Sequence, residues 1–177
     1  VEETGAAQHL RDSRIATIYE GTNGIQALDL VGRKLKMDGG KHWKALFAQM
    51  RAFVSAIKSD GSLPMLQDPL AQAVDALQTA AQTLFDNEDY SLDTAAGASQ
   101  FMRMFGIILG GYLLAQQAHA AKTMLAKGEG NKPYLETKLN TARFYAAQIL
   151  PQGPALLGPV LAGGEELFAV NEDQFTA

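Results

Sequence analysis

Apolar residues recur every three or four positions along most of the chain, which predicts helices rather than strands. One helix is predicted over residues 4–19, and a second begins at Ile25 and ends at the glycine pair Gly39-Gly40. Between them lies Glu20-Gly21-Thr22-Asn23-Gly24, where the glycines relax the backbone limits and Thr22 or Asn23 can cap the second helix through a side-chain oxygen. No other segment shows such an unusual local design.

The rest of the chain predicts a bundle of longer helices. Helices are expected over 41–59, from Asp68-Pro69 to about Phe85, over 92–126 and over 133–150, with at most one short helix near 155–162. Asp68 is expected to be an N-cap, with proline at the first helical position. The length of the 92–126 pattern suggests a central helix, and the short connections favour antiparallel neighbours. The predicted fold class is all-α, an antiparallel helical bundle.

The composition changes most near Gly39-Gly40, which suggests a division of the chain there. Residues 1–38 are expected to belong to one structural unit. Residues 39–177 are expected to form a self-contained helical unit.

Composition and charge narrow the possible functions. The 177 residues include no cysteine, so a disulfide, a thiolate zinc site and a cysteine nucleophile are excluded. The net charge of -4 and the scattered basic residues argue against nucleic-acid binding. The most apolar stretch, 105–115, is too short and too glycine-interrupted to span a bilayer. His9, His42 and His119 have no partners at ligand spacing, so no metal site is expected.

Glu20 is the residue that could carry chemistry. Its neighbours Ile18 and Tyr19 would partly desolvate the carboxylate and raise its pKa toward the range of a general base. The backbone N–H groups near Thr22 could then polarise a substrate carbonyl, which suits proton abstraction next to that carbonyl. The alternative interpretation is a solvated carboxylate at a helix end.

These residues also carry a resemblance. Arg11-Asp12-x-Arg14-Ile15, then Tyr19-Glu20-Gly21-Thr22 and Ile25-Gln26, resemble the C-terminal signature of acyl-CoA dehydrogenases, and Glu2-Glu3-Thr4-Gly5 onward resembles the large bacterial members. Residues after about Leu35 resemble, more loosely, the extra C-terminal helical domain of those members. Residues 1–38 would then be the end of the C-terminal helical domain that holds the catalytic glutamate, and residues 39–177 the extra domain.

The resemblance implies a role for each matching residue. Glu20 would remove the α-proton of an acyl-CoA thioester while a hydride leaves the β-carbon for FAD, giving a trans-2-enoyl-CoA. Tyr19 and Gly21 would contact substrate, and Thr22, Asn23 and Gly24 would lie against FAD. Many smaller members have Ser-Gln where this chain has Asn23-Gly24, a form that the larger members share.

The resemblance also implies partners and surroundings. Electrons would pass to an electron-transfer flavoprotein, and the enzyme would be a homodimer or tetramer in the bacterial cytoplasm, with no membrane span. Residues 1–14 show no targeting signal and no initiator Met, so the chain is expected to be a piece of a longer enzyme. The domains that hold flavin cannot fit in this chain, and the isolated chain is therefore expected to be inactive.

Three alternatives remain open at this point. One is a flavin-containing relative of the DNA-alkylation response proteins, which bind duplex DNA. Another is an acyl-CoA oxidase, in which reduced flavin meets oxygen directly. The third is a purely structural or oligomerisation role for the residues after Gly40.

Overall fold

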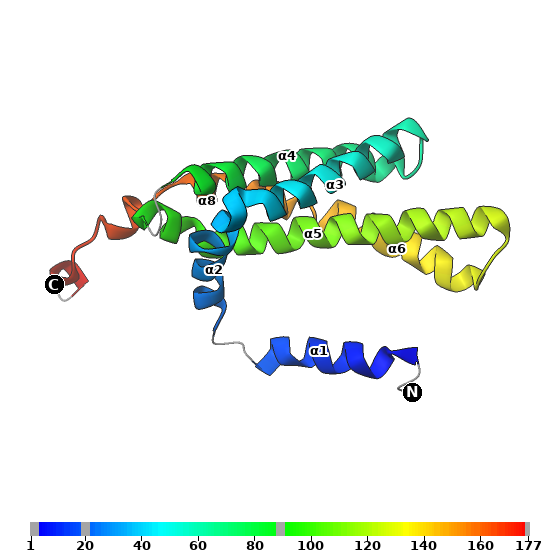
Figure 1. The fold of residues 1–177 in the computed structure, drawn as a ribbon, viewed down its shortest axis with the longest axis horizontal. Coiled ribbons are helices and arrows are strands. Elements are labelled where there is room, and N and C mark those ends of the chain that lie inside the picture. Colours follow the sequence, from blue (N-terminus) through cyan, green and yellow to red (C-terminus); the bar gives the residue numbers. More distant parts are fainter. Residues whose placement is uncertain (1–3, 19–21, 88–90, 176–177) are drawn as a thin grey trace.

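The computed structural model describes residues 4–18, 22–87 and 91–175, and these residues form helices and no strand. The predicted all-α helical bundle is confirmed (Figure 1). In chain order the elements are α1 (Ala6–Ile18), α2 (Asn23–Gly32), η3 (Lys34–Gly40), α3 (Lys41–Ser59), α4 (Pro64–Asp86), α5 (Leu92–Lys127), α6 (Lys132–Gln148), α7 (Gln152–Ala155), α8 (Leu157–Leu161), η4 (Glu166–Phe168) and η5 (Glu172–Phe175).

The long helix α5 is the centre of the bundle, as its length suggested. It packs against α2, α4, α6 and α8, and the α3–α4 hairpin runs beside it (Figure 1). Phe101, Met104 and Ile108 of α5 are fully buried, and Phe47 of α3 lies 5.8 Å from the Phe105 ring, measured between ring centroids. One apolar core therefore joins all the long helices of the described chain.

Within the described residues, α5 is the one helix long and apolar enough to cross a membrane, judged by length and composition alone. The central helix of a bundle needs the same composition, because several of its faces contact other helices. The packing of α5 against its neighbouring helices accounts for its apolar character.

Side-chain caps and a glycine mark the ends of α5 and the start of α6. The Ser91 hydroxyl accepts a hydrogen bond from the Thr94 N–H at 3.2 Å and caps α5. Gly128 ends α5 with a left-handed φ of 71°, and the Asn131 side chain caps α6. The segment from Gly128 to Asn131 is therefore a loop that ends α5 and precedes α6.

The second helix ends earlier than predicted. α2 stops at Gly32, and the chain continues as the irregular 3-10 segment η3, in which Asp38, Gly39 and Gly40 all have positive φ. The tight η3 turns bury Leu35, and they bring its carbonyl within 3.0 Å of the Trp43 indole Nε1, which donates a hydrogen bond to it. The glycine pair thus ends η3 rather than a continuous helix.

The start of α4 also differs from the prediction. The helix begins at Pro64, so Asp68 is not its N-cap and Pro69 lies inside it. Burial of Leu63 and Leu66 explains the earlier start, because the extra turn places both side chains in the core. Pro64 occupies the first helical position, where its missing N–H is not needed. Asp68 instead pairs with Lys58, with 2.8 Å between Nζ and Oδ1.

The tail holds two short α-helices, α7 and α8, where at most one was predicted. Pro154 and Pro159 are each the third residue of their helix. The first four N–H groups of a helix have no partner within it, so a proline there removes no helical hydrogen bond. Both prolines are therefore compatible with the helices of the tail.

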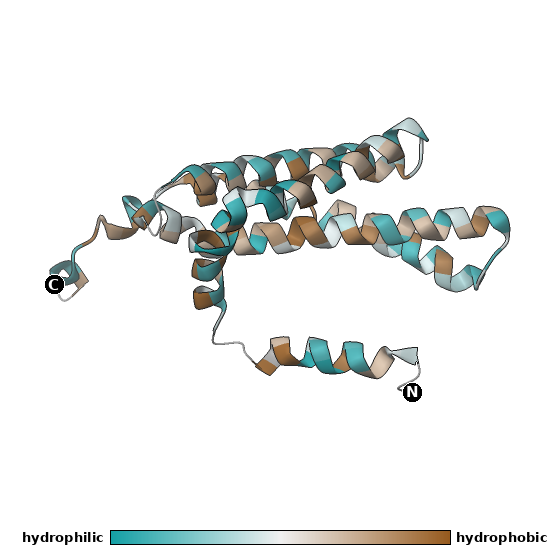
Figure 2. Ribbon diagram, viewed as in Figure 1, coloured by the Kyte–Doolittle hydropathy of each residue, from teal (hydrophilic) through white to brown (hydrophobic). Residues whose placement is uncertain are grey.

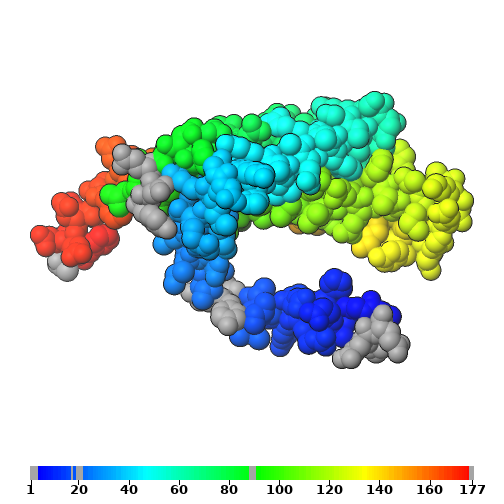
Figure 3. All heavy atoms as spheres, viewed as in Figure 1, coloured from blue at the N-terminus to red at the C-terminus, as the bar shows by residue number. Residues whose placement is uncertain are grey.

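The predicted division of the chain between residues 38 and 39 stays a prediction. Packing is continuous across it, because Ala27, Val31 and Leu35 belong to the same core as the α3–α6 helices. By contrast, α1 stands apart from the bundle (Figures 1 and 3).

Candidate functional site

The predicted site lies where α1 gives way to α2. Tyr19, Glu20 and Gly21, the predicted substrate contacts and base, lie outside the described residues. Thr22, Asn23 and Gly24, the predicted flavin contacts, follow one another at the start of α2. Their roles, like that of Glu20, stay predictions.

The first turn of α2 is open to a ligand. Thr22 occupies the N-cap position with φ -106° and ψ 4°, and its side chain makes no capping hydrogen bond, contrary to one of the two predicted caps. Asn23 and Gly24 are exposed, and a Cβ added to Gly24 would meet no atom within 4 Å. The N–H groups of this turn carry the positive end of the helix dipole, which favours a negative or polar ligand group there.

One side of α2 is fixed by the bundle. Ala27 and Val31 are fully buried where α2 packs against α5, and Leu35 is buried one turn further on. The hydrogen bond from Trp43 to the Leu35 carbonyl ties this segment to α3. The bundle therefore sets the direction in which the start of α2 points.

The opposite side of α2 is apolar and uncovered. Ile25 is 69% exposed and Leu28 is 42% exposed, and Ile18 at the end of α1 is 68% exposed. Figure 2 shows hydrophobic residues at the end of α1 and along α2. Large apolar side chains on both sides of Glu20 thus face outward in the described chain.

Asp29 is the charged residue of α2. Its carboxylate is surrounded by positive charges, whereas a carboxylate that acts as a general base is partly desolvated and has a raised pKa. The Arg33 guanidinium donates to both carboxylate oxygens, at 2.7 and 2.9 Å, and the Lys34 Nζ lies 3.2 Å from Oδ2. These partners, Arg33 first, hold the pKa of Asp29 below its ordinary value. Asp29 is therefore a paired carboxylate at neutral pH, and the spacing of four residues to Arg33 was a signal that sequence reasoning missed.

The signature residues of α1 form a local network on an exposed surface. Gln8 donates to the Asp12 carboxylate at 2.8 Å and accepts from Arg11 at 3.2 Å. Asp12 is therefore part of a polar and exposed helix surface.

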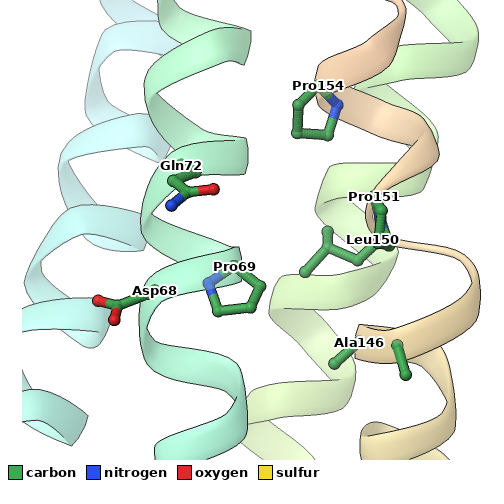
Figure 4. Close-up of a pocket in the computed structure, with 8 residues that line it drawn as sticks. Asp68, Pro69, Gln72, Ala146, Leu150, Pro151 and Pro154 are labelled. Atoms are coloured by element: carbon green, nitrogen blue, oxygen red, sulfur yellow. The ribbon is translucent and has the colours of Figure 1, made fainter.

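A cavity with a volume of about 430 Å³ lies between α4 and the α6–α7 junction (Figure 4). Its walls carry Pro69, Leu150, Pro151 and Pro154, and the Asp68 carboxylate points away from them (Figure 4). No nucleophile or base faces this cavity, so it has no evident catalytic chemistry.

The three histidines lie in different local surroundings. The described residues hold no cluster of three or more histidine, aspartate or glutamate side chains placed to bind a metal ion. His42 pairs with Asp38 at 2.9 Å, while the Nδ1 of His119 lies 3.2 Å from the hydroxyl of Ser62. Ser62 and His119 are 57 positions apart, so sequence spacing gave no signal of their contact.

Comparison with known proteins assigns a family. The family model described as acetyl-CoA dehydrogenase C-terminal like matches residues 46–171. The chain is 36% identical over 174 residues to 3-methylmercaptopropionyl-CoA dehydrogenase of Ruegeria pomeroyi, an alignment that covers 97% of this chain and 29% of that protein.

Two further relatives agree. The broad-specificity linear acyl-CoA dehydrogenase FadE5 of Mycobacterium tuberculosis is 30% identical, with 81% of this chain and 25% of that protein covered. A butyryl-CoA dehydrogenase of Syntrophomonas wolfei is 32% identical, with 85% and 25% covered. The chain thus spans between a quarter and a third of the length of these relatives and aligns with their C-terminal part. Because the family model covers well over half of the chain, the chain belongs to the family of C-terminal domains of acyl-CoA dehydrogenases.

Proposed function

We propose that the chain is the C-terminal part of an FAD-dependent acyl-CoA dehydrogenase in which Glu20 removes the α-proton of the thioester. The observation that carries the proposal is the position of the Glu20 motif immediately before α2, a helix whose direction is set by Ala27 and Val31 in the bundle core. A base must be held at a fixed place relative to the carbon it deprotonates, and a helix anchored in a core provides such a support.

In this proposal Glu20 takes the α-proton as its carboxylate becomes a carboxylic acid. Ile18 and Tyr19 keep water from the carboxylate, which favours proton transfer at neutral pH. The start of α2 directs backbone N–H groups toward the thioester oxygen, where negative charge grows as the proton leaves. Tyr19 lines the acyl pocket and Gly21 lets substrate approach the backbone.

FAD would supply the acceptor for the hydride that leaves the β-carbon. Thr22, Asn23 and Gly24 are the residues that would lie against it. The fit is supported by the open space around Gly24 and by the exposed first turn of α2. The product would be a trans-2-enoyl-CoA.

The longer protein would complete the site. The exposed apolar side chains here are Ile18, Ile25 and Leu28. Contact with another protein surface would remove them from water, which stabilises by about 25 cal/mol per Å² of apolar area covered. We infer that this face packs against the part of the polypeptide that holds flavin. The isolated chain would then neither retain FAD nor dehydrogenate acyl-CoA.

We further propose that residues 1–38 belong with the catalytic part of the enzyme and residues 39–177 form an additional helical domain that supports it. The contact of Trp43 with the Leu35 carbonyl would join the two parts. The whole enzyme would act as a homodimer or tetramer and pass electrons to an electron-transfer flavoprotein, as proposed from the family.

The test is flavin bleaching in the full-length protein with a panel of acyl-CoA thioesters of different chain lengths. Wild type is expected to bleach with at least one thioester, which names the substrate class. Glu20→Gln is expected to keep FAD and not bleach, whereas Glu129→Gln, a control in the exposed α5–α6 loop, is expected to behave as wild type. If neither wild type nor variant bleaches although both hold FAD, the dehydrogenase proposal is wrong.

A further inference from the structure

A small hollow of about 170 Å³ lies away from the Glu20 segment, where α4 begins and passes beside α5 and α6. In Figure 1 this is the end of the bundle at which α3 turns into α4. Leu63, Met65 and Leu139 give it an apolar wall, and Lys122 and Arg143 line the same space. It therefore combines an apolar surface with two positive charges contributed by different helices.

The two cations lack the partners that three other lysines of the described chain have. Lys58 pairs with Asp68 at 2.8 Å, Lys132 lies 3.8 Å from Glu136, and Lys138 donates to Gln117. Neither Lys122 nor Arg143 makes a hydrogen bond or ion pair with a described residue. Two positive charges that line one small hollow repel each other. A bound anion would attract both and so offset the repulsion.

The Asp60 carboxylate, on which the charge of Lys122 acts, already has hydrogen-bond partners. The Asp60 carboxylate accepts the Ser62 N–H at 2.7 Å and also interacts with the Ser62 hydroxyl. Lys122 acts on this carboxylate only as a nearby charge, without a hydrogen bond. The ammonium of Lys122 therefore keeps its donors for another acceptor, and Arg143 keeps the fork of donors that suits carboxylate or phosphate.

The wall of the hollow is rigid. The Gln67 side chain donates to the carbonyls of Ser62 and Ile57, at 2.8 and 2.9 Å, which fixes the α3–α4 turn. Leu63 is held there with a left-handed φ of 50°, a conformation that residues with a side chain rarely adopt. Its side chain is nonetheless buried, so the strained backbone keeps one wall of the hollow in place.

We propose that this hollow binds a small amphiphilic anion, a carboxylate or phosphate ester that carries a short alkyl chain. The anionic group contacts Lys122 and Arg143, and the alkyl chain lies against Leu63, Met65 and Leu139. The volume corresponds to about six water molecules, at roughly 30 Å³ each, which limits the ligand to a short chain. This site does not depend on Glu20 or on flavin.

The test is a titration of the 177-residue chain with hexanoate and with hexyl phosphate, followed by amide chemical shifts and by calorimetry. Hexanamide, which has the same chain without the charge, and inorganic phosphate, which has the charge without the chain, serve as controls. Saturable shifts are expected at residues 63–66, 122, 139 and 143. Both controls are expected to bind at least about tenfold more weakly, because each lacks one of the two interactions.

Charge variants sharpen the test. Lys122→Gln and Arg143→Gln are each expected to weaken binding about five- to tenfold, since each removes one charge-assisted contact. Lys127→Gln is the matched control, because Lys127 is an exposed lysine on the same helix that does not line this hollow. It is expected to leave the affinity unchanged.

The outcomes separate the two chemistries and allow the proposal to fail. Binding of hexanoate alone assigns a carboxylate ligand, and binding of hexyl phosphate alone assigns a phosphate ester. Equal binding of hexanamide, shifts scattered outside the hollow, or unchanged affinity in the Lys122→Gln/Arg143→Gln double variant would overturn it. Far-ultraviolet circular dichroism of that variant shows whether its fold is intact, and both residues are exposed, so the substitutions leave the core unaltered.

Discussion

Large apolar side chains are buried in the bundle of α3 to α6 but exposed in the N-terminal segment formed by α1 and α2. In the bundle, Phe47, Leu77 and Ile108 are buried almost completely. In the N-terminal segment, Leu10 is 70% exposed and Ile25 is 69% exposed. The bundle buries its apolar side chains among its own helices. The helices on either side of Glu20 instead expose an apolar surface of the kind that another protein surface covers.

α2 has both a buried side and an exposed side. Its inner side belongs to the core through Ala27 and Val31, and its outer side shares the exposure of α1 through Ile25 and Leu28. The bundle can therefore support a neighbouring segment that it does not itself enclose. The contrast explains why the bundle has a buried core while the residues on both sides of Glu20 stay exposed.

The largest effect is expected from a change in the bundle core. Leu77→Ala removes a fully buried side chain of α4 and is expected to lower the free energy of unfolding by about 2–5 kcal/mol. Leu10→Ala in exposed α1 is the matched control, with an expected change within about 0.5 kcal/mol. Urea unfolding followed by circular dichroism measures both, and equal effects would contradict the contrast between the two regions.

The two sides of α2 allow the same comparison within one helix. Val31→Ala on the buried side is expected to destabilise by about 2 kcal/mol, because two buried carbon atoms and some packing are lost. Ile25→Val on the exposed side is expected to change the stability of the isolated chain by less than about 0.5 kcal/mol. In the full-length protein, Ile25→Val should instead become destabilising if this side is covered there, so an unchanged melting temperature in both contexts would argue against a covered face.

The link between α2 and the bundle can be weakened at Trp43. Trp43→Phe leaves an aromatic ring but removes the donor to the Leu35 carbonyl, with an expected cost of about 1–2 kcal/mol. Amide hydrogen exchange is expected to rise in residues 27–35 more than in α5. A uniform rise across the whole bundle would show that Trp43 supports the core in general rather than this link.

The smallest effect is expected from pH. Asp29 has a lowered pKa in the folded chain, so its stabilising contribution is present above the ordinary pKa of 3.8 and is lost as pH falls through the lower folded value. Asp29→Asn should therefore lower the melting temperature slightly at pH 7, and the difference should shrink as pH falls below 3.8. A difference between variant and wild type that persists unchanged at low pH would rule out the ion pairs as its source.

The parts of the fold that local chemistry decides were predictable. The ends of α3 at Lys41 and Ser59 follow from the glycine pair before it and the Asp60-Gly61 turn after it, and Gly128 ends α5 as expected. The start of α4 was missed because burial of Leu63 and Leu66 outweighed the capping signal of Asp68. Tertiary packing overrides a local signal in such cases.

The candidate sites also differ in how far the sequence alone could reveal them. The Glu20 motif is contiguous in sequence, so its residue types and spacing were enough to raise the hypothesis of a base. The contacts of Ser62 with His119, and of Lys122 and Arg143 around one hollow, join helices that are distant in sequence. Periodicity cannot predict such contacts, because they depend on how the helices pair.

The most direct test is the single-turnover rate of flavin reduction in the full-length protein with its best acyl-CoA substrate. Wild type, Glu20→Gln and Glu129→Gln would be compared at equal FAD content. If Glu20 is the base, Glu20→Gln slows reduction by about 10²–10⁴-fold or more, the usual contribution of a general base, while Glu129→Gln matches wild type. Reduction by Glu20→Gln at the wild-type rate would show that another residue removes the α-proton.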